Sequence, residues 1–460
     1  MNFLFFINLC GILIEVFKLE IMDLEEISLE KNTESIMSLT NETYSAYCDI
    51  LKEELHLAMG CTEPIAIAYA AAVARGYLGN EPTAITIGLS GNIIKNTKSV
   101  VVPATGGMHG IAAAVVAGTV ANRSDLVLEV LSGLTRDDIP KMQVMIETCP
   151  IEVGELETDH IFEILLVMKN DTDEVKVRLL DRHTNLVYVE KNGQVLVKNE
   201  AEEEDGGIKT DRTLLTVENI VAFVDEVNLN DVRELLNRQI ASNMAIAEEG
   251  LKGEYGACIG KIIYKEGNCT IAEKARAFAA AGSDARMNGC EMPVCIISGS
   301  GNQGITSSVP VVVYAREMGK SEDEMLRAVL LSDLITTHLK TGIGCLSAYC
   351  GAISAGAGCG AGIAYLNGGR FKEIAHTIVN SLAILSGTIC DGAKSSCAAK
   401  IAMAVESGIL GYEMYKNGHQ FYGGEGIVTK GVENTIANVG KLARQGMYGT
   451  DKEIIKIMLE

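Results

Sequence analysis

Hydrophobic residues recur at helical spacing from Thr43 to Leu78, and the string Gly-Cys-Thr-Glu-Pro at 60–64 interrupts them. This pattern predicts two helices joined by a sharp turn, because glycine and proline are poor residues for the interior of a helix. We expect Thr62 to cap the second helix and Pro64 to lie in its first turn, where a missing N–H costs little.

In the middle of the chain, polar and apolar residues alternate as is typical of strands. Between Phe162 and Lys198, four such runs are separated by turn residues, which predicts an antiparallel β-meander. Upstream, residues 83–90 predict a strand and residues 106–121 a helix rich in small residues. An acidic run with two glycines at 202–207 predicts a linker.

After Leu214 the helical pattern continues almost to the end, with two helices rich in small residues expected at 343–369 and 371–389. The predicted fold class is therefore α+β, with a mixed N-terminal half that contains the antiparallel meander and a nearly all-α C-terminal half. We divide the chain into an N-terminal extension at 1–42, an α+β domain at 43–207 and a mostly helical, catalytic domain at 208–460.

The apolar run at residues 3–14 is short of the roughly 20 residues that cross a bilayer. It also lacks a basic leading segment and a small-residue cleavage site, so it does not fit a secretory signal. Met22 opens a polar stretch that is typical of a natural start. We therefore expect residues 1–21 to be dispensable, and the choice between Met1 and Met22 as the true start stays open.

Composition narrows the classes of function. The chain has 60 acidic and 39 basic residues and a net charge of −21, which argues against nucleic-acid and anionic-membrane partners because phosphates need a basic surface. Its 13 cysteines are too few for a disulfide scaffold and lie in apolar or glycine-rich runs, so we predict a reduced, cytoplasmic protein. The sequence leaves formation of a homo-oligomer open.

Cys390 and Cys397 lie seven residues apart on a glycine-broken junction between predicted helices, and Cys350 lies 40 residues before Cys390, one helical hairpin away. An antiparallel pair of helices would bring their thiols together. The spacing matches neither a zinc ribbon nor a ferredoxin. Taken alone, it favours buried cysteines that pack as small hydrophobic residues.

A glycine-rich string from Ser298 to Gly304 follows an apolar segment and contains the spacing G-x-G-x-x-G. The residues beyond it are helical and do not continue a βαβ array, which argues against a dinucleotide site. We interpret it as a loop of exposed N–H groups and polar side chains, including Ser300, Asn302 and Gln303, that holds a small carboxylate or phosphate. The alternative is an ordinary tight turn.

Another thiol, that of Cys61, stands at a predicted helix start. The positive end of the helix dipole favours a thiolate, so Cys61 is a candidate base or nucleophile, although a lone cysteine there is more often structural. Lys95 and Arg286 are candidate partners for a carboxylate, or else ordinary surface charges. His183, inside the meander, fits a structural sheet residue as well as a functional one.

Five strings occur in order along the chain: GCTEP at 60–64, SDARM at 283–287, SGSGNQGIT at 298–306, LSAYC at 346–350 and ICDGAKSSC at 389–397. Together they resemble the iron–sulfur-dependent L-cysteine desulfidase family, which is related to the alpha chain of bacterial iron–sulfur L-serine dehydratases. The resemblance extends from about Tyr44 to the C-terminus and leaves the N-terminal extension outside.

The resemblance implies a [4Fe–4S] cluster held by three cysteines, which match Cys350, Cys390 and Cys397. It also implies a proton-accepting cysteine, which matches Cys61, with Glu63 as the competing base. The more distant serine dehydratases place a first ligand near Cys345, so the choice between Cys345 and Cys350 stays open.

The activity implied by the resemblance is elimination of L-cysteine to sulfide, ammonia and pyruvate. Three cysteine ligands leave one iron of a cubane without a protein ligand, which is an open Lewis-acid site. We expect residues 300–304 to hold the carboxylate or ammonium of this small amino-acid substrate. The alternatives are a serine dehydratase with the same cluster, a non-enzymatic cluster or thiol sensor, and a pyridoxal-phosphate enzyme, for which no lysine lies in a convincing context.

Overall fold

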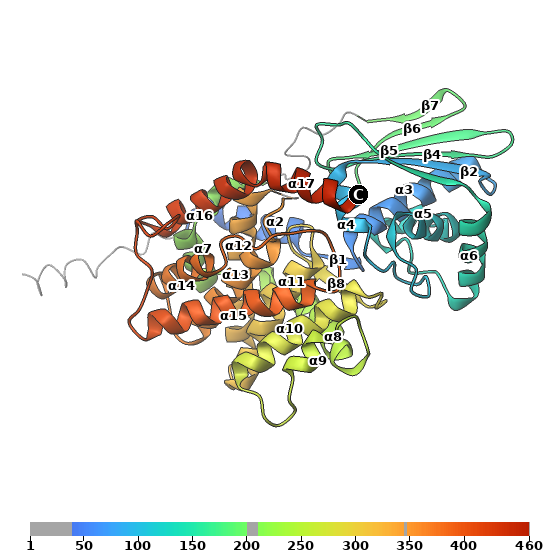
Figure 1. The fold of residues 1–460 in the computed structure, drawn as a ribbon. Coiled ribbons are helices and arrows are strands. Elements are labelled where there is room, and N and C mark those ends of the chain that lie inside the picture. Colours follow the sequence, from blue (N-terminus) through green and yellow to red (C-terminus); the bar gives the residue numbers. More distant parts are fainter. Residues whose placement is uncertain (1–38, 200–209, 345–346, 460) are drawn as a thin grey trace, which may run out of the picture. The chain divides into compact units, whose positions relative to one another are not determined.

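Two regions of different secondary structure follow one another along the chain in a computed structural model, which describes residues 39–199, 210–344 and 347–459 (Figure 1). The first region is built on a β-sheet and the second on packed helices, so the predicted α+β fold class is confirmed. The predicted linker and residues 1–38 of the predicted extension lie outside the described residues. Asn41–Glu460 forms one compact unit, and the division of the chain near residue 207 stays a prediction.

A six-stranded sheet forms the first region, in the order β3-β2-β4-β5-β6-β7. Strands β2 and β3 pair in parallel, and the other neighbouring strands pair antiparallel. The meander predicted between Phe162 and Lys198 is therefore confirmed, as is the strand predicted at 83–90. The strands are β2 (Ala84–Leu89), β3 (Ile151–Glu155), β4 (Glu163–Lys169), β5 (Glu174–Leu180), β6 (Leu186–Lys191) and β7 (Gln194–Lys198).

Helices α3 and α5 lie along one face of this sheet (Figure 1). Alternate residues of the central strands, such as Ile164, Leu166 and Val177, point to this face and are fully buried. Each such side chain contributes roughly 1.5–3 kcal/mol when it leaves water, so the alternation read from the sequence determines which face the helices cover. The helices of this region are α3 (Thr62–Leu78), α4 (Gly91–Thr97), α5 (Gly110–Ala121) and α6 (Ile139–Thr148). Helix α2 (Asn41–Glu54) comes before them in the chain but packs on the second region, where Tyr44 and Tyr47 contact Phe223.

A short antiparallel ribbon of β1 (His56–Met59) and β8 (Pro293–Ile296) corrects the prediction at two places. Strand β1 lies between the two helices predicted around Gly60, and β8 interrupts the helical C-terminal half. Neither strand is long enough to show a period of two, and each is stabilised by a partner far away in the sequence. The ribbon brings together the segments that lead into Cys61 and Ser300.

The second region consists of helices packed at close range. A Cβ on Gly356 would lie 2.3 Å from the carbonyl oxygen of Ala404, so two of the helices can cross only where a glycine is present. The helices predicted at 343–369 and 371–389 are present as α13 and α14, both shorter than predicted. The helices are α7 (Val217–Glu226), α8 (Arg233–Lys252), α9 (Ile259–Ile263), α10 (Ile271–Met287), α11 (Gly301–Glu317), α12 (Glu322–Ile343), α13 (Gly351–Leu366), α14 (Phe371–Ile384), α15 (Cys397–Lys416), α16 (Val432–Lys441) and α17 (Tyr448–Leu459).

Every helix within residues 39–199, 210–344 and 347–459 is too short or too polar to cross a membrane.

Candidate active site

The five motif strings meet where several helices begin. Cys61, Ser300 and Cys350 directly precede α3, α11 and α13, and Cys397 is the first residue of α15. At each of these starts the residue before the helix makes no side-chain cap, so the first N–H groups are left for other acceptors. Helix N-termini carry a partial positive charge, and the arrangement therefore favours anions at this point.

Two of these starts differ from the prediction. Cys61, and not Thr62, precedes α3, while Pro64 lies in the first turn as expected. The string from Ser298 to Gly304 is not a free loop of exposed N–H groups, because α11 begins at Gly301 and Gln303 is buried. The polar side chains of the string are instead held on the first turn of a helix, which fixes their direction.

A backbone bridge brings together two of the three predicted cluster cysteines, Cys350 and Cys390. Tyr349 pairs with Ile389, and the N–H of Cys390 donates to the carbonyl of Ala348 at 2.6 Å. The thiol of Cys350 lies within hydrogen-bonding reach of Cys390. The charge of Cys397 acts on Cys350, and that of Cys390 acts on Cys397. All three side chains are half-buried, and Cys345 lies outside the described residues.

The environment of Cys390 favours its thiolate. The hydrogen bond from the Cys350 thiol lowers the pKa of Cys390 to about 5, against the opposing effect of burial, and Lys95 and Lys340 add to the fall. The same hydrogen bond, together with burial, raises the pKa of Cys350 well above its usual value. The pair therefore shares one proton and one negative charge at neutral pH.

The chemistry of this trio fits an iron–sulfur cluster. Within the described part of the chain, no group of three or more His, Cys, Asp or Glu residues is already set to hold a single metal ion. A cubane binds each cysteine through a different iron, so its ligands need not converge on one ion. The three thiols lie close together, and one of them is stabilised as a thiolate, which is the form of cysteine that binds metals. They are therefore suitable ligands.

Cys61 and Glu63 form a hydrogen-bonded pair beside the trio. The Cys61 thiol donates to Oε2 of Glu63 at 3.1 Å, and Asn96 donates to the other oxygen, Oε1, at 3.0 Å. Cys61 shares an apolar cluster with Met287, against which Cys397 packs. The dyad is therefore buried next to one of the candidate ligands.

The expectation of a Cys61 thiolate is wrong. Burial raises the pKa of the Cys61 thiol well above its usual value, and the Glu63 carboxylate raises it further, while Arg286 opposes the change. Burial alone would also raise the pKa of Glu63, but His183, the Cys61 thiol and Arg286 outweigh burial and lower it. The proton therefore lies on sulfur and the charge on the carboxylate.

Three polar side chains of the motif strings each have one buried atom without a hydrogen-bond partner among the described residues. These atoms are Nε of Arg286, a residue only 2% exposed, Oδ1 of Asn302 and Oε1 of Gln303. A Cβ on Gly301 would lie 2.4 Å from Nε of Arg286, and one on Gly351 would lie 2.9 Å from Cδ of Gln303. Arg286 thus lies against the start of α11, and Gln303 against the start of α13.

The other two residues predicted to bind substrate are placed differently. Lys95 is buried in an ion pair with Asp451 on α17, so its ammonium group is already held. Ser300 is half-buried at the start of α11 and does not cap the helix with its hydroxyl. Local sequence patterns gave no sign of Asp451 or of the contact between Asn96 and Glu63, because both join segments that are distant in the sequence.

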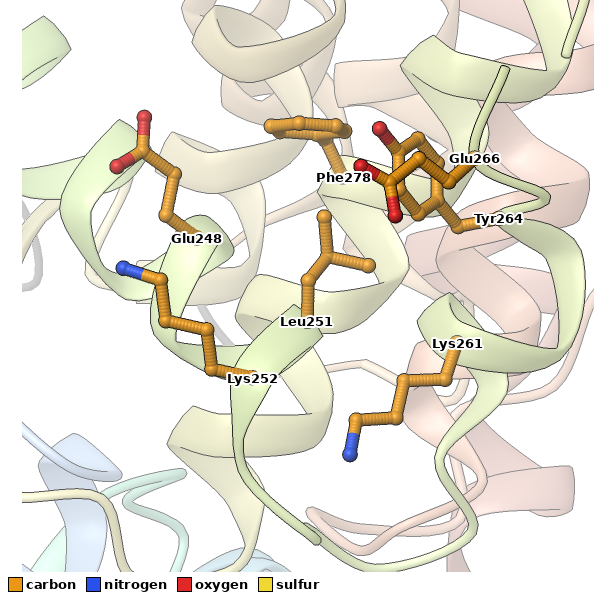
Figure 2. Close-up of a pocket in the computed structure, with 7 residues that line it drawn as sticks. All are labelled: Glu248, Leu251, Lys252, Lys261, Tyr264, Glu266 and Phe278. Atoms are coloured by element: carbon orange, nitrogen blue, oxygen red, sulfur yellow. The ribbon is translucent and has the colours of Figure 1, made fainter.

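A separate pocket of about 600 Å³ lies beside α8, α9 and α10 (Figure 2). Its lining includes Leu251, Tyr264 and Phe278 with charged residues at its rim, and none of the motif cysteines. This pocket is therefore distinct from the candidate active site.

A mixed α+β fold whose site combines a thiol–carboxylate pair, a buried guanidinium and three further thiols is typical of an enzyme. The chain belongs to the serine dehydratase alpha chain family, whose family model matches residues 127–456. This confirms the relation suggested by the five strings. Arg286 and the three candidate ligands lie inside the matched range, whereas Cys61 and Glu63 lie before it.

Similar proteins cover nearly the whole chain. A UPF0597 protein of Desulfitobacterium hafniense is 54% identical over 92% of this chain and 98% of its own length. UPF0597 proteins of Treponema denticola and Lachnoclostridium phytofermentans are 44% and 45% identical, over 92% and 90% of this chain and 100% of their own lengths.

Proposed function

We propose that the protein is a carbon–sulfur lyase that eliminates sulfide from L-cysteine, giving ammonia and pyruvate, with a [4Fe–4S] cluster on Cys350, Cys390 and Cys397. The observation that carries the proposal is a set of buried, unpartnered groups that complement a zwitterionic amino acid beside a proton-accepting pair. The family relation supports the lyase chemistry, and the five strings support cysteine as substrate.

Arg286 and the first turn of α11 bind the two charged groups of the substrate. A buried guanidinium whose Nε–H has no partner is costly, and a carboxylate that accepts hydrogen bonds from this side chain removes that cost. The free amide oxygens of Asn302 and Gln303 accept hydrogen bonds from the ammonium group. Because Arg286 binds the carboxylate and the amide oxygens bind the ammonium group, the substrate is held in one orientation. The direction of its Cα–H bond is thereby fixed.

The Cys61–Glu63 dyad accepts the Cα proton. As the Cα–H bond breaks, its proton moves to the sulfur of Cys61 while the proton of the thiol moves to Oε2 of Glu63, across the 3.1 Å hydrogen bond. This transfer neutralises the negative charge of the dyad. It does not require Cys61 to be a thiolate before the substrate binds. Asn96 holds Glu63 in place by donating to its other oxygen.

The electrons of the C–S bond leave with the hydrosulfide ion, and the 2-aminoacrylate that remains tautomerises and hydrolyses to pyruvate and ammonia. When bound, the cluster would supply an iron without a protein ligand, which is a Lewis acid for the departing sulfur. Lys95 and Lys340 offset the negative charge that the cysteine ligands gather in this buried place.

L-Serine is the second candidate substrate, because the matching family is named for serine dehydratase. The test is anaerobic purification, analysis of iron and labile sulfide, and initial rates with L-cysteine, L-serine and, as a stereochemical control, D-cysteine. We expect iron and sulfide in roughly equal amounts and equal yields of sulfide and pyruvate from L-cysteine, at a higher kcat/KM than for L-serine. A preference for L-serine would make the protein a serine dehydratase, and bound iron without turnover of either amino acid would make it a sensor.

A further inference from the structure

The connection between β5 and β6 is held in one conformation. Asp181 adopts a left-handed backbone with φ of 61°, and its N–H donates to the carbonyl of Phe162 at 2.9 Å. The side chain of Asn185 donates to the carbonyl of Leu180 at 3.0 Å and closes the turn. Because both ends of this turn are hydrogen-bonded, the direction of the His183 side chain between them is fixed.

His183 reaches from the β5–β6 turn, at one end of the strands, to the candidate active site. Its ring packs edge-on against Phe162, with centroids 4.8 Å apart, and its Cε1 lies 3.8 Å from the position of a Cβ on Gly299. Nε2 is buried and has no hydrogen-bond partner within the described residues, although the side chain as a whole is only half-buried. Gly299 itself is exposed, so this imidazole lies between the buried site and solvent.

Glu63 is the charged group that acts on this imidazole. Burial lowers the pKa of His183, and Glu63 opposes that fall. No direct hydrogen bond joins the two side chains in the described structure, but Thr62 connects their surroundings. Its hydroxyl oxygen lies 3.1 Å from Oε2 of Glu63 and 3.1 Å from the carbonyl oxygen of Gly299, the residue next to the imidazole. At neutral pH His183 is therefore uncharged and able to accept a proton.

The proposed elimination needs a route for such a proton. Each turnover leaves the Cα proton on the Cys61–Glu63 dyad, while the hydrosulfide ion departs with the electrons of the C–S bond. The dyad must lose this proton before it can act again. Arg286 cannot take it, because a guanidinium stays protonated in proteins.

We propose that His183 is the proton-transfer residue that carries this proton from Glu63 to solvent. Nε2 accepts the proton that leaves Oε2 of Glu63, and the imidazolium releases one proton to water at the exposed side of the ring. No net charge accumulates, because Glu63 returns to a carboxylate and His183 to a neutral imidazole. The assignment rests on the proposed function and adds to it a residue from the turn between β5 and β6, outside the five motif strings.

The first test compares His183→Ala and His183→Gln with His419→Ala, a control at an exposed histidine. With L-cysteine, we expect both His183 variants to lower kcat by about 10²-fold, the lower end of general acid–base effects, while KM and iron content stay unchanged. Added imidazole should restore turnover in His183→Ala, because a free imidazole can carry the same proton. Full activity of His183→Gln, or a failure of imidazole to rescue His183→Ala, would overturn the proposal.

The second test does not depend on turnover. Histidine NMR titration should give a lower pKa for His183 in Glu63→Gln than in the wild-type protein, because the carboxylate favours the imidazolium. An unchanged His183 titration would contradict the coupling of the two groups. A wild-type protein that turns over neither L-cysteine nor L-serine would overturn the proposed function itself, whereas an active wild type with a fully active His183→Ala would overturn only the role of His183.

Discussion

Cys61 and Cys390 are the same residue type in one buried site, yet their thiols are driven in opposite directions. Cys61 precedes helix α3, where the dipole favours a thiolate, but its pKa is raised because it is buried beside Glu63. Cys390 lies outside any helix, and its pKa falls to about 5 because the Cys350 thiol donates to it and two lysines lie nearby. Burial, together with neighbouring hydrogen bonds and charges, therefore outweighs the helix dipole in determining the state of a thiol.

The difference also separates two kinds of chemistry. A cysteine stabilised as a thiolate is prepared to bind iron, whereas a thiol hydrogen-bonded to a carboxylate is prepared to pass a proton. The same site can thus use one set of cysteines as ligands and another cysteine in acid–base catalysis.

The largest effect is expected when Cys390, the cysteine stabilised as a thiolate, is replaced. Serine at Cys390 should abolish both iron content and activity, because a hydroxyl does not replace a thiolate ligand. Cys350→Ser and Cys397→Ser should do the same, as measured by iron analysis and visible absorbance after anaerobic purification. The matched control is Cys359→Ala, a fully buried cysteine of α13 outside the trio, which should keep its iron.

If Cys390→Ser kept its full iron content, Cys390 would not be a ligand. The proposed difference in role between Cys390 and Cys61 would then be wrong. Loss of iron in Cys345→Ser, with iron kept in Cys350→Ser, would move one ligand to Cys345.

The next largest effect is expected at the dyad. Cys61→Ala and Glu63→Gln should each lower kcat by about 10²–10⁴-fold with iron retained, because each removes one half of the proton acceptor. The double variant should be little worse than either single variant, since the two residues act as a unit. Steady-state kinetics on samples of confirmed iron content measure this.

Near-normal turnover in Cys61→Ala with loss in Glu63→Gln would give the role to Glu63 alone. Loss of iron in Cys61→Ala would make Cys61 a ligand. The proposal that one iron has no protein ligand would then be wrong.

A smaller effect is expected when one of the cations near Cys390 is removed. Lys95 is 1% exposed in its pair with Asp451, so Lys95→Met should lower the free energy of unfolding by about 3–5 kcal/mol by leaving a buried carboxylate unpaired. Chemical denaturation measures this, and the double variant Lys95→Met/Asp451→Leu should recover most of the loss. Lys52→Met, at an exposed pair with Asp49, should cost less than about 1 kcal/mol. Equal losses in Lys95→Met and Lys52→Met would contradict the buried pair.

The smallest effect is expected in the ionisation of Cys61 itself. Glu63 raises the pKa of this thiol both by its charge and by accepting its hydrogen bond, so Glu63→Gln should move the titration of Cys61 to lower pH. The pH dependence of its alkylation by iodoacetamide, followed by peptide mass spectrometry, measures the change. Because Cys61 stays buried, its midpoint should remain above that of Cys390. A midpoint that does not move would show that burial alone determines the state of Cys61.

Local patterns in the sequence determined most of the secondary structure. The alternation between Phe162 and Lys198 gave the antiparallel meander, because side chains on a strand point to opposite faces with a period of two. The five ordered strings indicated the family relation. They also contain the three candidate ligands, the Cys61–Glu63 pair and Arg286. These properties depend on neighbours in the chain, which a sequence displays directly.

Only the tertiary structure decided how those residues behave. The β1–β8 ribbon, the pair of Lys95 with Asp451 and the effect of His183 on the pKa of Glu63 all involve segments that are far apart in the chain. The charge state of Cys61 was wrongly predicted for the same reason. A helix start is visible in the sequence, whereas a pKa depends on burial and on every charge within a few ångströms, and both are set by packing.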